Sequence, residues 1–279
     1  MYIQTSEMRD NFIRGLKERY ACSLPTKSIK NKADIIFAAT NLYVSGTPFV
    51  SPINESAQPH YASDEISLLS TILDPFVTIV WEYFNAKIAP TTQLDFDIVH
   101  ERLCDEFLRN ITIAGRYVHT YGNAQKMTNM LFKYLVCFAD ASEYADWFRY
   151  CHVALDRYTY NGYRLQFYGK VVYPSLNNGR CAPALESWSQ IATYADYKTI
   201  SDDIVSYVGS HPKTYNDYVD ICDRFPTLPT ISKLLEDYVL TPFEAEFFIW
   251  TIAKACMKKT SDKKGVYSSS FVRSIRDLL

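Results

Sequence analysis

Two residues near the middle of the chain have side chains suited to amine chemistry beside a nucleic-acid backbone. Lys126 lies in residues 121–128, which read Tyr-Gly-Asn-Ala-Gln-Lys-Met-Thr, and Asp156 follows 30 positions later. A glycine turn before a helix lets backbone N–H groups face a phosphate, and the helix dipole adds to that attraction. A lysine at the head of the helix can attack an electrophilic carbon, while a carboxylate stabilises the positive charge that develops. Lys126 and Asp156 are therefore the candidate catalytic pair.

The segment that carries Lys126 is the clearest helix in the sequence. Its apolar residues recur at helical spacing and predict one buried stripe: Met127, Met130, Leu131, Tyr134, Leu135 and Phe138. At about 100° per residue, Lys126 and Lys133 lie about 20° apart around the axis, and Asn129 lies near them. We expect these three residues to share a polar face, where the charge of Lys133 would lower the pKa of Lys126.

Residues 121–128 resemble the second half of the helix-hairpin-helix motif of the base-excision DNA glycosylase superfamily. The pattern of that family is Pro-Gly-x-Gly-x-Lys-x-Ala; Gly122 matches its first glycine and Lys126 the lysine that attacks the sugar. Residues 154–156, Ala-Leu-Asp, are similar to the family segment whose aspartate assists the chemistry. The resemblance implies catalytic roles for Lys126 and Asp156. It also implies nucleic-acid contacts from Gly122, Asn123, Ala124, Gln125, Asn129 and Lys133.

The resemblance covers residues 116–158 and departs from the family pattern in three ways. Tyr121 stands in the place of the proline, and Ala124 replaces the second glycine. The interval between Lys126 and Asp156 is longer than is usual in the family, so residues 139–150 would be an insertion. The cysteine cluster frequent in that family is absent from the sequence.

The resemblance implies that the protein removes a damaged or modified base from DNA, with lyase activity as an option. DNA is the expected partner, and neither a cofactor nor a metal ion is expected. A target base must leave the stack to be cut, and aromatic side chains can stack against it. Two alternatives stay open: a helical nucleic-acid-binding module without catalysis, and a protein-interaction module. Structural roles also stay open, with Lys126 as a solvated side chain and Asp156 as a helix cap.

Composition narrows the class of protein. With 48% hydrophobic and 22% charged residues, the chain is typical of a globular protein. Its net charge of −2 creates no global field for nucleic acid, so binding would need a local basic patch such as residues 250–279.

The seven cysteines form no Cys-x-x-Cys pair, which indicates reduced thiols in the cytoplasm and no zinc or iron–sulfur site. The apolar stretch 68–84 contains Asp74, Pro75 and Glu82, so we expect no membrane span.

Helical periodicity dominates the chain, and we expect an all-α protein, a two-lobed helical bundle with one β-hairpin near residues 163–183. Residues 1–279 read as one helical domain. A central lobe of about 95–210 and a second lobe of the N- and C-terminal helices is an option that the sequence leaves open, as it does the oligomeric state. Besides the helix of Lys126, helices are expected at residues 8–16, 33–43, 63–74, 76–87, 95–110, 140–149, 185–194, 199–208, 213–222, 230–238 and 242–258.

Overall fold

The regular secondary structure of the described residues is helical. The computed structural model describes residues 9–10, 12–13, 21–45, 63–113, 119–156, 159, 188–224, 228 and 230–258. Within these ranges there is no strand, only one isolated antiparallel bridge between Thr214 and Val239. The all-α class is therefore confirmed, whereas the hairpin expected near residues 163–183 lies outside the described residues.

The helices follow the sequence periodicity closely in most places. In chain order they are η1 (Ala21–Thr26), α2 (Lys32–Ser45), α3 (Ser63–Phe84), α4 (Gln93–Ile113), α5 (Tyr121–Leu135), η3 (Ala141–Tyr144), α6 (Ala145–Phe148), η4 (Trp188–Gln190), α8 (Tyr194–Ser210), α9 (Tyr215–Asp223) and α10 (Pro242–Lys258).

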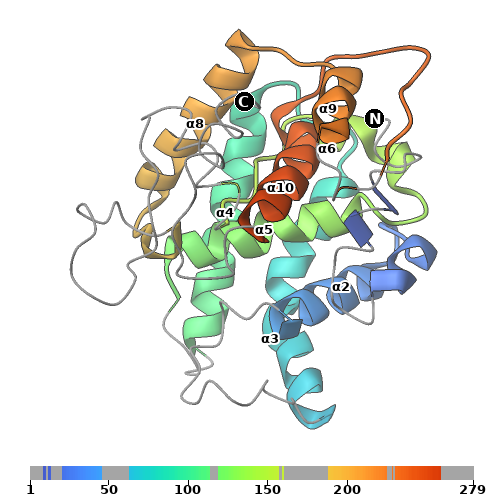
Figure 1. Ribbon diagram of the computed structural model, residues 1–279. Coiled ribbons are helices and arrows are strands. Elements are labelled where there is room, and N and C mark those ends of the chain that lie inside the picture. Colours follow the sequence, from blue (N-terminus) through green and yellow to red (C-terminus); the bar gives the residue numbers. More distant parts are fainter. Residues whose placement is uncertain are drawn as a thin grey trace.

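Helix α5 forms the centre of the packing. Figure 1 shows it (green) crossing the middle of the molecule, and it contacts α2, α4, α8 and η4. Its Phe132 packs against the rings of Tyr83, Phe84 and Phe96 from α3 and α4. Because α5 is covered on several sides, a side chain on its polar face also meets protein. The division of the chain into two lobes stays a prediction.

Helix α3 corrects the expected break at Pro75. A proline inside a helix removes one backbone hydrogen bond and tends to kink the helix, which is why two helices were expected here. The structure has one continuous helix, with Pro75 inside it. Leu73, Phe76 and Val77 around the proline are fully buried, and this apolar packing outweighs the lost bond.

Part of α3 also has the length and hydropathy of a membrane-spanning helix. This stretch is Ile66–Phe84, and 39% of it is buried inside the protein. The core helix of a soluble protein can have the same length and hydropathy, so these two properties alone are weak evidence for a membrane span.

The helix expected at residues 230–238 is a second wrong prediction, because these residues form no helix. The side chain of Asn216 exchanges two hydrogen bonds with the backbone of Leu234, at 2.8 and 3.0 Å. Tyr215 N donates to the carbonyl oxygen of Tyr238 at 2.9 Å. These pairings with the start of α9 satisfy backbone groups that a helix would have satisfied internally. Similarly, only the short η4 is described within the helix expected at 185–194, and α8 begins at Tyr194.

The expected start of α10 is confirmed. Thr241 is followed by Pro242, as in an N-cap with proline at the first helical position. Glu244 N donates to Thr241 Oγ1 at 3.2 Å, and Thr241 N donates to Glu244 Oε2 at 3.0 Å. This capping box fixes where α10 begins and therefore which of its side chains face α5.

Candidate functional site

The N-terminus of α5 is capped and covered by protein. Thr120 accepts a hydrogen bond from the backbone of Asn123, and the Asn123 side chain accepts from the backbone of Thr120, a reciprocal capping box. Gly122 N donates to the carbonyl oxygen of Ile191 at 3.0 Å. A Cβ on Gly122 would lie 1.9 Å from the carbonyl oxygen of Trp188, so only glycine allows this close approach. Gly122 thus serves helix packing here.

All six residues predicted to contact nucleic acid are buried: Gly122, Asn123, Ala124, Gln125, Asn129 and Lys133. The Asn123, Gln125 and Asn129 side chains hydrogen-bond within the protein, and that of Lys133 forms an ion pair. Direct contact with nucleic acid stays a prediction for these residues, and this packing argues against it. The expected polar face of α5 is therefore turned inward except at Lys126, which is half-buried.

The two lysines of that face have different surroundings. Lys126 Nζ lies 4.7 Å from the ring centroid of Trp188, a cation–π contact. Lys133 is fully buried, pairs with Glu246 of α10, and lies 4.7 and 4.5 Å from the rings of Phe12 and Phe247. The Glu246 carboxylate compensates the charge of Lys133, and the effect of Lys133 on Lys126 stays a prediction.

Asp156 is buried, and both of its carboxylate oxygens accept hydrogen bonds. Oδ1 accepts from the backbone N–H of Thr159 at 3.0 Å, while Asp156 N donates to Thr159 Oγ1 at 3.0 Å. This reciprocal pattern matches a helix cap, the structural role left open for Asp156. The other oxygen, Oδ2, accepts from Trp250 Nε1 at 3.0 Å, so the carboxylate also contacts α10.

The side chain of Gln125 joins the segment before Asp156 to the start of α5. Its Nε2 donates to the carbonyl oxygen of Leu155 at 2.8 Å, and its Oε1 accepts from Leu155 N at 3.1 Å. Gln125 directly precedes Lys126, and Leu155 directly precedes Asp156. The backbones of the two candidate catalytic residues are therefore linked through their neighbours, although 30 positions separate them in the chain. Their side chains contact different residues: Lys126 lies over Trp188, and Asp156 bonds to Thr159 and Trp250.

Glu246 of α10 is within electrostatic reach of both. Burial raises the pKa of the Glu246 carboxyl to about 7. Lys133 and Lys126 act to lower this pKa, whereas the charge of Asp156 acts to raise it. The candidate site thus consists of two cations and two carboxylates, namely Glu246 and the charged groups that act on its pKa, and of these Lys133 and Glu246 form an ion pair.

A second buried polar network lies on the side of α5 that faces α4 and α8. His152 pairs with Asp97 Oδ1 at 2.7 Å and with the Tyr197 hydroxyl at 2.9 Å. Asn129 Nδ2 donates to the same hydroxyl at 3.0 Å, and its Oδ1 lies 3.0 Å from His100 Nε2. The network connects through Asn129 and Gln125 to the candidate site, since Asn129 Nδ2 also donates to Gln125 Oε1 at 3.2 Å.

Burial controls protonation in this network. It lowers the pKa of His100 well below its usual value, and the neighbouring His152 adds to that effect. Burial also lowers the pKa of His152, against the raising effect of Asp97. For Asp97, burial acts to raise the pKa, but hydrogen bonds from His152 and Gln93 outweigh it and lower the pKa. Sequence spacing did not single out Asp97, His100 or Tyr197 of this network, because their partners come from separate parts of the chain.

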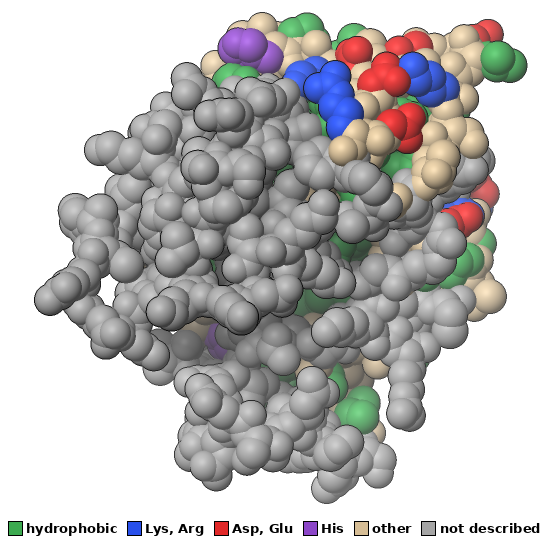
Figure 2. Space-filling model, viewed as in Figure 1, with side chains coloured by type: hydrophobic (Ala, Val, Ile, Leu, Met, Phe, Trp, Pro, Cys, Tyr) green, Lys and Arg blue, Asp and Glu red, His purple; other side chains and the backbone are tan. Residues whose placement is uncertain are grey.

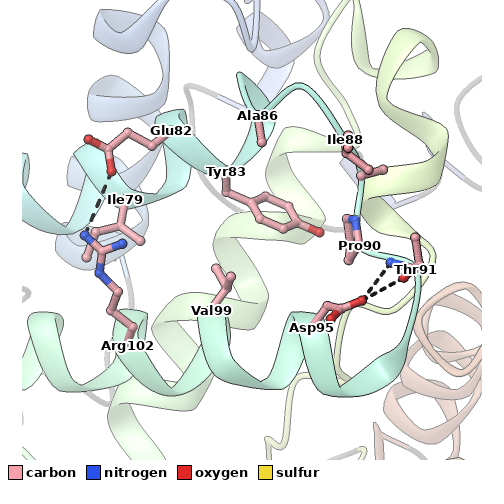
Figure 3. A pocket seen from close by; sticks show the side chains of 11 residues that line it. Ile79, Glu82, Tyr83, Ala86, Ile88, Pro90, Thr91, Asp95, Val99 and Arg102 are labelled. Carbon is pink, nitrogen blue, oxygen red and sulfur yellow. Dashed lines mark hydrogen bonds and ion pairs between the residues drawn. The ribbon is translucent and has the colours of Figure 1, made fainter.

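A pocket of about 440 Å³ lies elsewhere, between the C-terminal half of α3, the following loop and α4. Figure 3 shows Tyr83 directed into it, with Ile88 and Pro90 on the loop side and Val99 on α4. Neither Lys126 nor Asp156 lines this pocket. Beside it, Ile88, Leu94 and Ile98 are 76%, 65% and 62% exposed. This surface therefore combines exposed apolar side chains with the charged Glu82, Asp95 and Arg102, and it is separate from the candidate site.

Among the residues with described placement, no three His, Cys, Asp or Glu side chains are grouped to hold a metal ion. No protein-family model, no curated protein and no solved structure gives a significant match to this chain.

Proposed function

We propose that the protein is a DNA glycosylase-like enzyme in which Lys126 is the nucleophile and Asp156 assists it. The observation that supports this proposal is the pair of hydrogen bonds between Gln125 and Leu155, at 2.8 and 3.1 Å. They hold the chain neighbours of the two residues side by side, which is a first condition for a reaction that uses an amine and a carboxylate together. The proposal assigns no DNA contact to the buried residues of α5.

The surroundings of both side chains support the proposed roles. Lys126 is half-buried beside Trp188, which limits its hydration. The hydrogen bonds from Thr159 and Trp250 fix both oxygens of Asp156, so its carboxylate has a defined orientation. A carboxylate held in place stabilises developing positive charge without having to reorganise first.

In the proposed reaction, the neutral Lys126 amine attacks the anomeric carbon of the sugar. The new C–N bond forms as the bond to the base breaks, and the base leaves with that electron pair and takes up a proton. Asp156 stabilises the positive charge on the sugar in the transition state. The nitrogen then loses both of its protons, and the bond from the anomeric carbon to the ring oxygen breaks, with the oxygen keeping the electron pair and taking up a proton. The product is an imine, in which the Lys126 nitrogen is double-bonded to the former anomeric carbon.

Borohydride trapping tests the nucleophile. Duplex DNA with an abasic site presents an aldehyde that any well-placed neutral amine converts into an imine, and reduction makes the adduct permanent. We expect an adduct with the wild-type protein and none with Lys126→Ala. Lys27→Ala is the matched control, because Lys27 Nζ lies 4.5 Å over the ring of Phe37, as Lys126 does over Trp188. An adduct that persists in Lys126→Ala, or a wild-type protein without any adduct, contradicts the lysine mechanism.

A second set of substrates tests base removal and the role of Asp156. DNA duplexes that each carry one damaged or modified base are incubated with the protein, and release of the free base is measured. Asp156→Asn removes the negative charge, and we expect slower release by about 10²-fold or more, as when a transition-state charge contact is lost. Unchanged release in Asp156→Asn would exclude the assisting role.

The proposal includes a cytoplasmic location. Cys104, Cys137, Cys151 and Cys222 are free and buried, which supports a reducing compartment.

On the described part of the surface in Figure 2, Lys and Arg side chains lie beside Asp and Glu side chains. We therefore expect DNA binding to be modest and sensitive to salt.

The exposed apolar side chains beside the α3–α4 pocket favour a second candidate function, a protein-interaction module. Ile88 and Ile98 are 76% and 62% exposed there, although such side chains are usually buried. DNA binding at low salt and borohydride trapping together separate the two functions. A protein without DNA binding at low salt and without a borohydride adduct is the outcome expected for the interaction module.

A further inference from the structure

Helix α10 contributes two residues to the candidate site that the sequence resemblance does not assign. Glu246 and Trp250 are four residues apart, so they lie on one face of the helix, one turn from each other. Glu246 pairs with Lys133, and Trp250 Nε1 donates to Asp156 Oδ2 at 3.0 Å. One face of α10 is thus bonded both to α5 and to the candidate carboxylate.

The indole of Trp250 is held in place on more than one side. Its ring lies edge-on to Phe12, with centroids 6.3 Å apart. Lys133 Nζ lies 5.7 Å from the same ring, and this lysine is itself fixed by the ion pair with Glu246. A donor on a ring packed in this way points in one direction, so it can set the orientation of the carboxylate that accepts from it.

The two oxygens of Asp156 have different partners. Oδ1 accepts from the backbone N–H of Thr159 at 3.0 Å and from its Oγ1 at 3.3 Å, and both bonds are local in the chain and hold one oxygen only. Oδ2 accepts from Trp250, which lies 94 positions away, and this bond to the other oxygen fixes the plane of the carboxylate. The orientation of Asp156 therefore depends on α10 being packed against α5.

We propose that Trp250 is a positioning residue for Asp156, so that the docking of α10 controls whether the site is assembled. This inference rests on the proposed function, because positioning has a catalytic meaning only if Asp156 assists a reaction. Trp250 itself touches neither the sugar nor the base in this proposal. Its indole N–H holds the carboxylate in the orientation in which it stabilises the charge on the sugar.

The test replaces Trp250 by phenylalanine, which keeps an aromatic ring and removes the N–H donor. We expect kcat for base release to fall about 10- to 100-fold, the equivalent of one hydrogen bond to a charged group. KM should change less than about twofold, because the indole does not bind DNA. Trp147→Phe is the matched control, since Trp147 Nε1 also donates one bond of 3.0 Å, to the carbonyl oxygen of Tyr83.

A double-mutant cycle separates positioning from a general structural role. If Trp250 acts through Asp156, then Trp250→Phe added to Asp156→Asn lowers kcat no further. A second measurement is independent of catalysis: the indole N–H proton resonance of Trp250 should move upfield in Asp156→Asn, whereas that of Trp147 should not.

The outcomes distinguish this inference from the proposed function. A wild-type protein that releases no base and forms no adduct overturns both. An active wild type with Trp250→Phe equally active overturns the positioning role alone. Equal losses in Trp250→Phe and Trp147→Phe, or fully multiplicative losses in the double variant, also overturn it. Loss of kcat in Trp250→Phe alone, absent on the Asp156→Asn background, is the expected result.

Discussion

The buried ion pair between Lys133 and Glu246 gives a prediction about stability: removing one charge should destabilise the protein, whereas removing both should not. Both side chains are only 1% exposed. Glu246→Gln leaves the Lys133 ammonium without its carboxylate inside the protein. Loss of one partner of a buried pair costs about 3–5 kcal/mol of unfolding free energy, because the remaining charge is uncompensated.

The aromatic surroundings of Lys133 place the expected cost toward the lower end of that range. The rings of Phe12 and Phe247 lie 4.7 and 4.5 Å from Nζ. Each desolvated cation–π contact contributes up to about 2 kcal/mol, and these contacts survive in Glu246→Gln. We therefore expect a loss of about 3 kcal/mol. The double variant Lys133→Met/Glu246→Leu removes both charges, and we expect it to lie within about 1 kcal/mol of the wild type or above it.

Urea unfolding followed by far-ultraviolet circular dichroism measures these differences. The measurements are made at about pH 8, above the pKa of about 7 that burial gives Glu246, so that the carboxyl group is ionised. Asp220→Asn is the control, because the Lys233–Asp220 pair has side chains 52% exposed and should cost less than about 1 kcal/mol. A Glu246→Gln cost below about 1 kcal/mol, or a double variant as unstable as the single one, refutes the reasoning.

Three further predictions concern the elements around the site. Burial keeps His100 and His152 neutral in the folded protein, so stability should be lost as pH falls below 6.5 toward their lowered pKa values; His100→Gln should flatten this acid limb in urea titrations. Gly122→Ala puts a Cβ 1.9 Å from a backbone oxygen and should cost at least about 2 kcal/mol. In Gly209→Ala, in α8, the added Cβ meets no atom within 4 Å, so the free energy of unfolding in the same urea titrations should instead rise by up to about 1 kcal/mol. Gln125→Leu leaves both backbone groups of Leu155 unpaired and should cost about 1–3 kcal/mol by calorimetry, with a slower borohydride reaction.

The helix of Lys126 shows how far local sequence determines structure. The apolar spacing along α5 predicted the helix and most of its buried stripe. Met127, Leu131 and Leu135 are fully buried, whereas Met130 is half-buried and Phe138 lies beyond the end of α5. The spacing also placed the polar residues on one face, but it does not specify what covers that face. The partner of Lys133 is Glu246, more than a hundred residues further along the chain. No local pattern indicates such a partner.

The two corrected helix predictions have related causes. Pro75 was expected to end a helix, since the cost of a proline inside a helix is local and visible in sequence. The burial of Phe76 and Val77 that offsets this cost is tertiary. Residues 230–238 had helical periodicity, but their backbone pairs with Asn216 and Tyr215 instead. In both cases contacts with other parts of the chain outweighed the local preference.

Local sequence indicates Lys126 and Asp156 but not the residues that support them. Residue type and spacing single out a nucleophile and an assisting carboxylate, because those side chains act through their own chemistry. Gln125 and Trp250 act through geometry, since one bonds to Leu155 and the other to Asp156 across the fold. A tryptophan in an amphipathic helix is expected to be a core anchor, and only its 3.0 Å bond to the carboxylate distinguishes it from one. If Trp250→Phe alters kcat while Trp147→Phe does not, that hydrogen bond is functional, and the position of α10 becomes part of the mechanism.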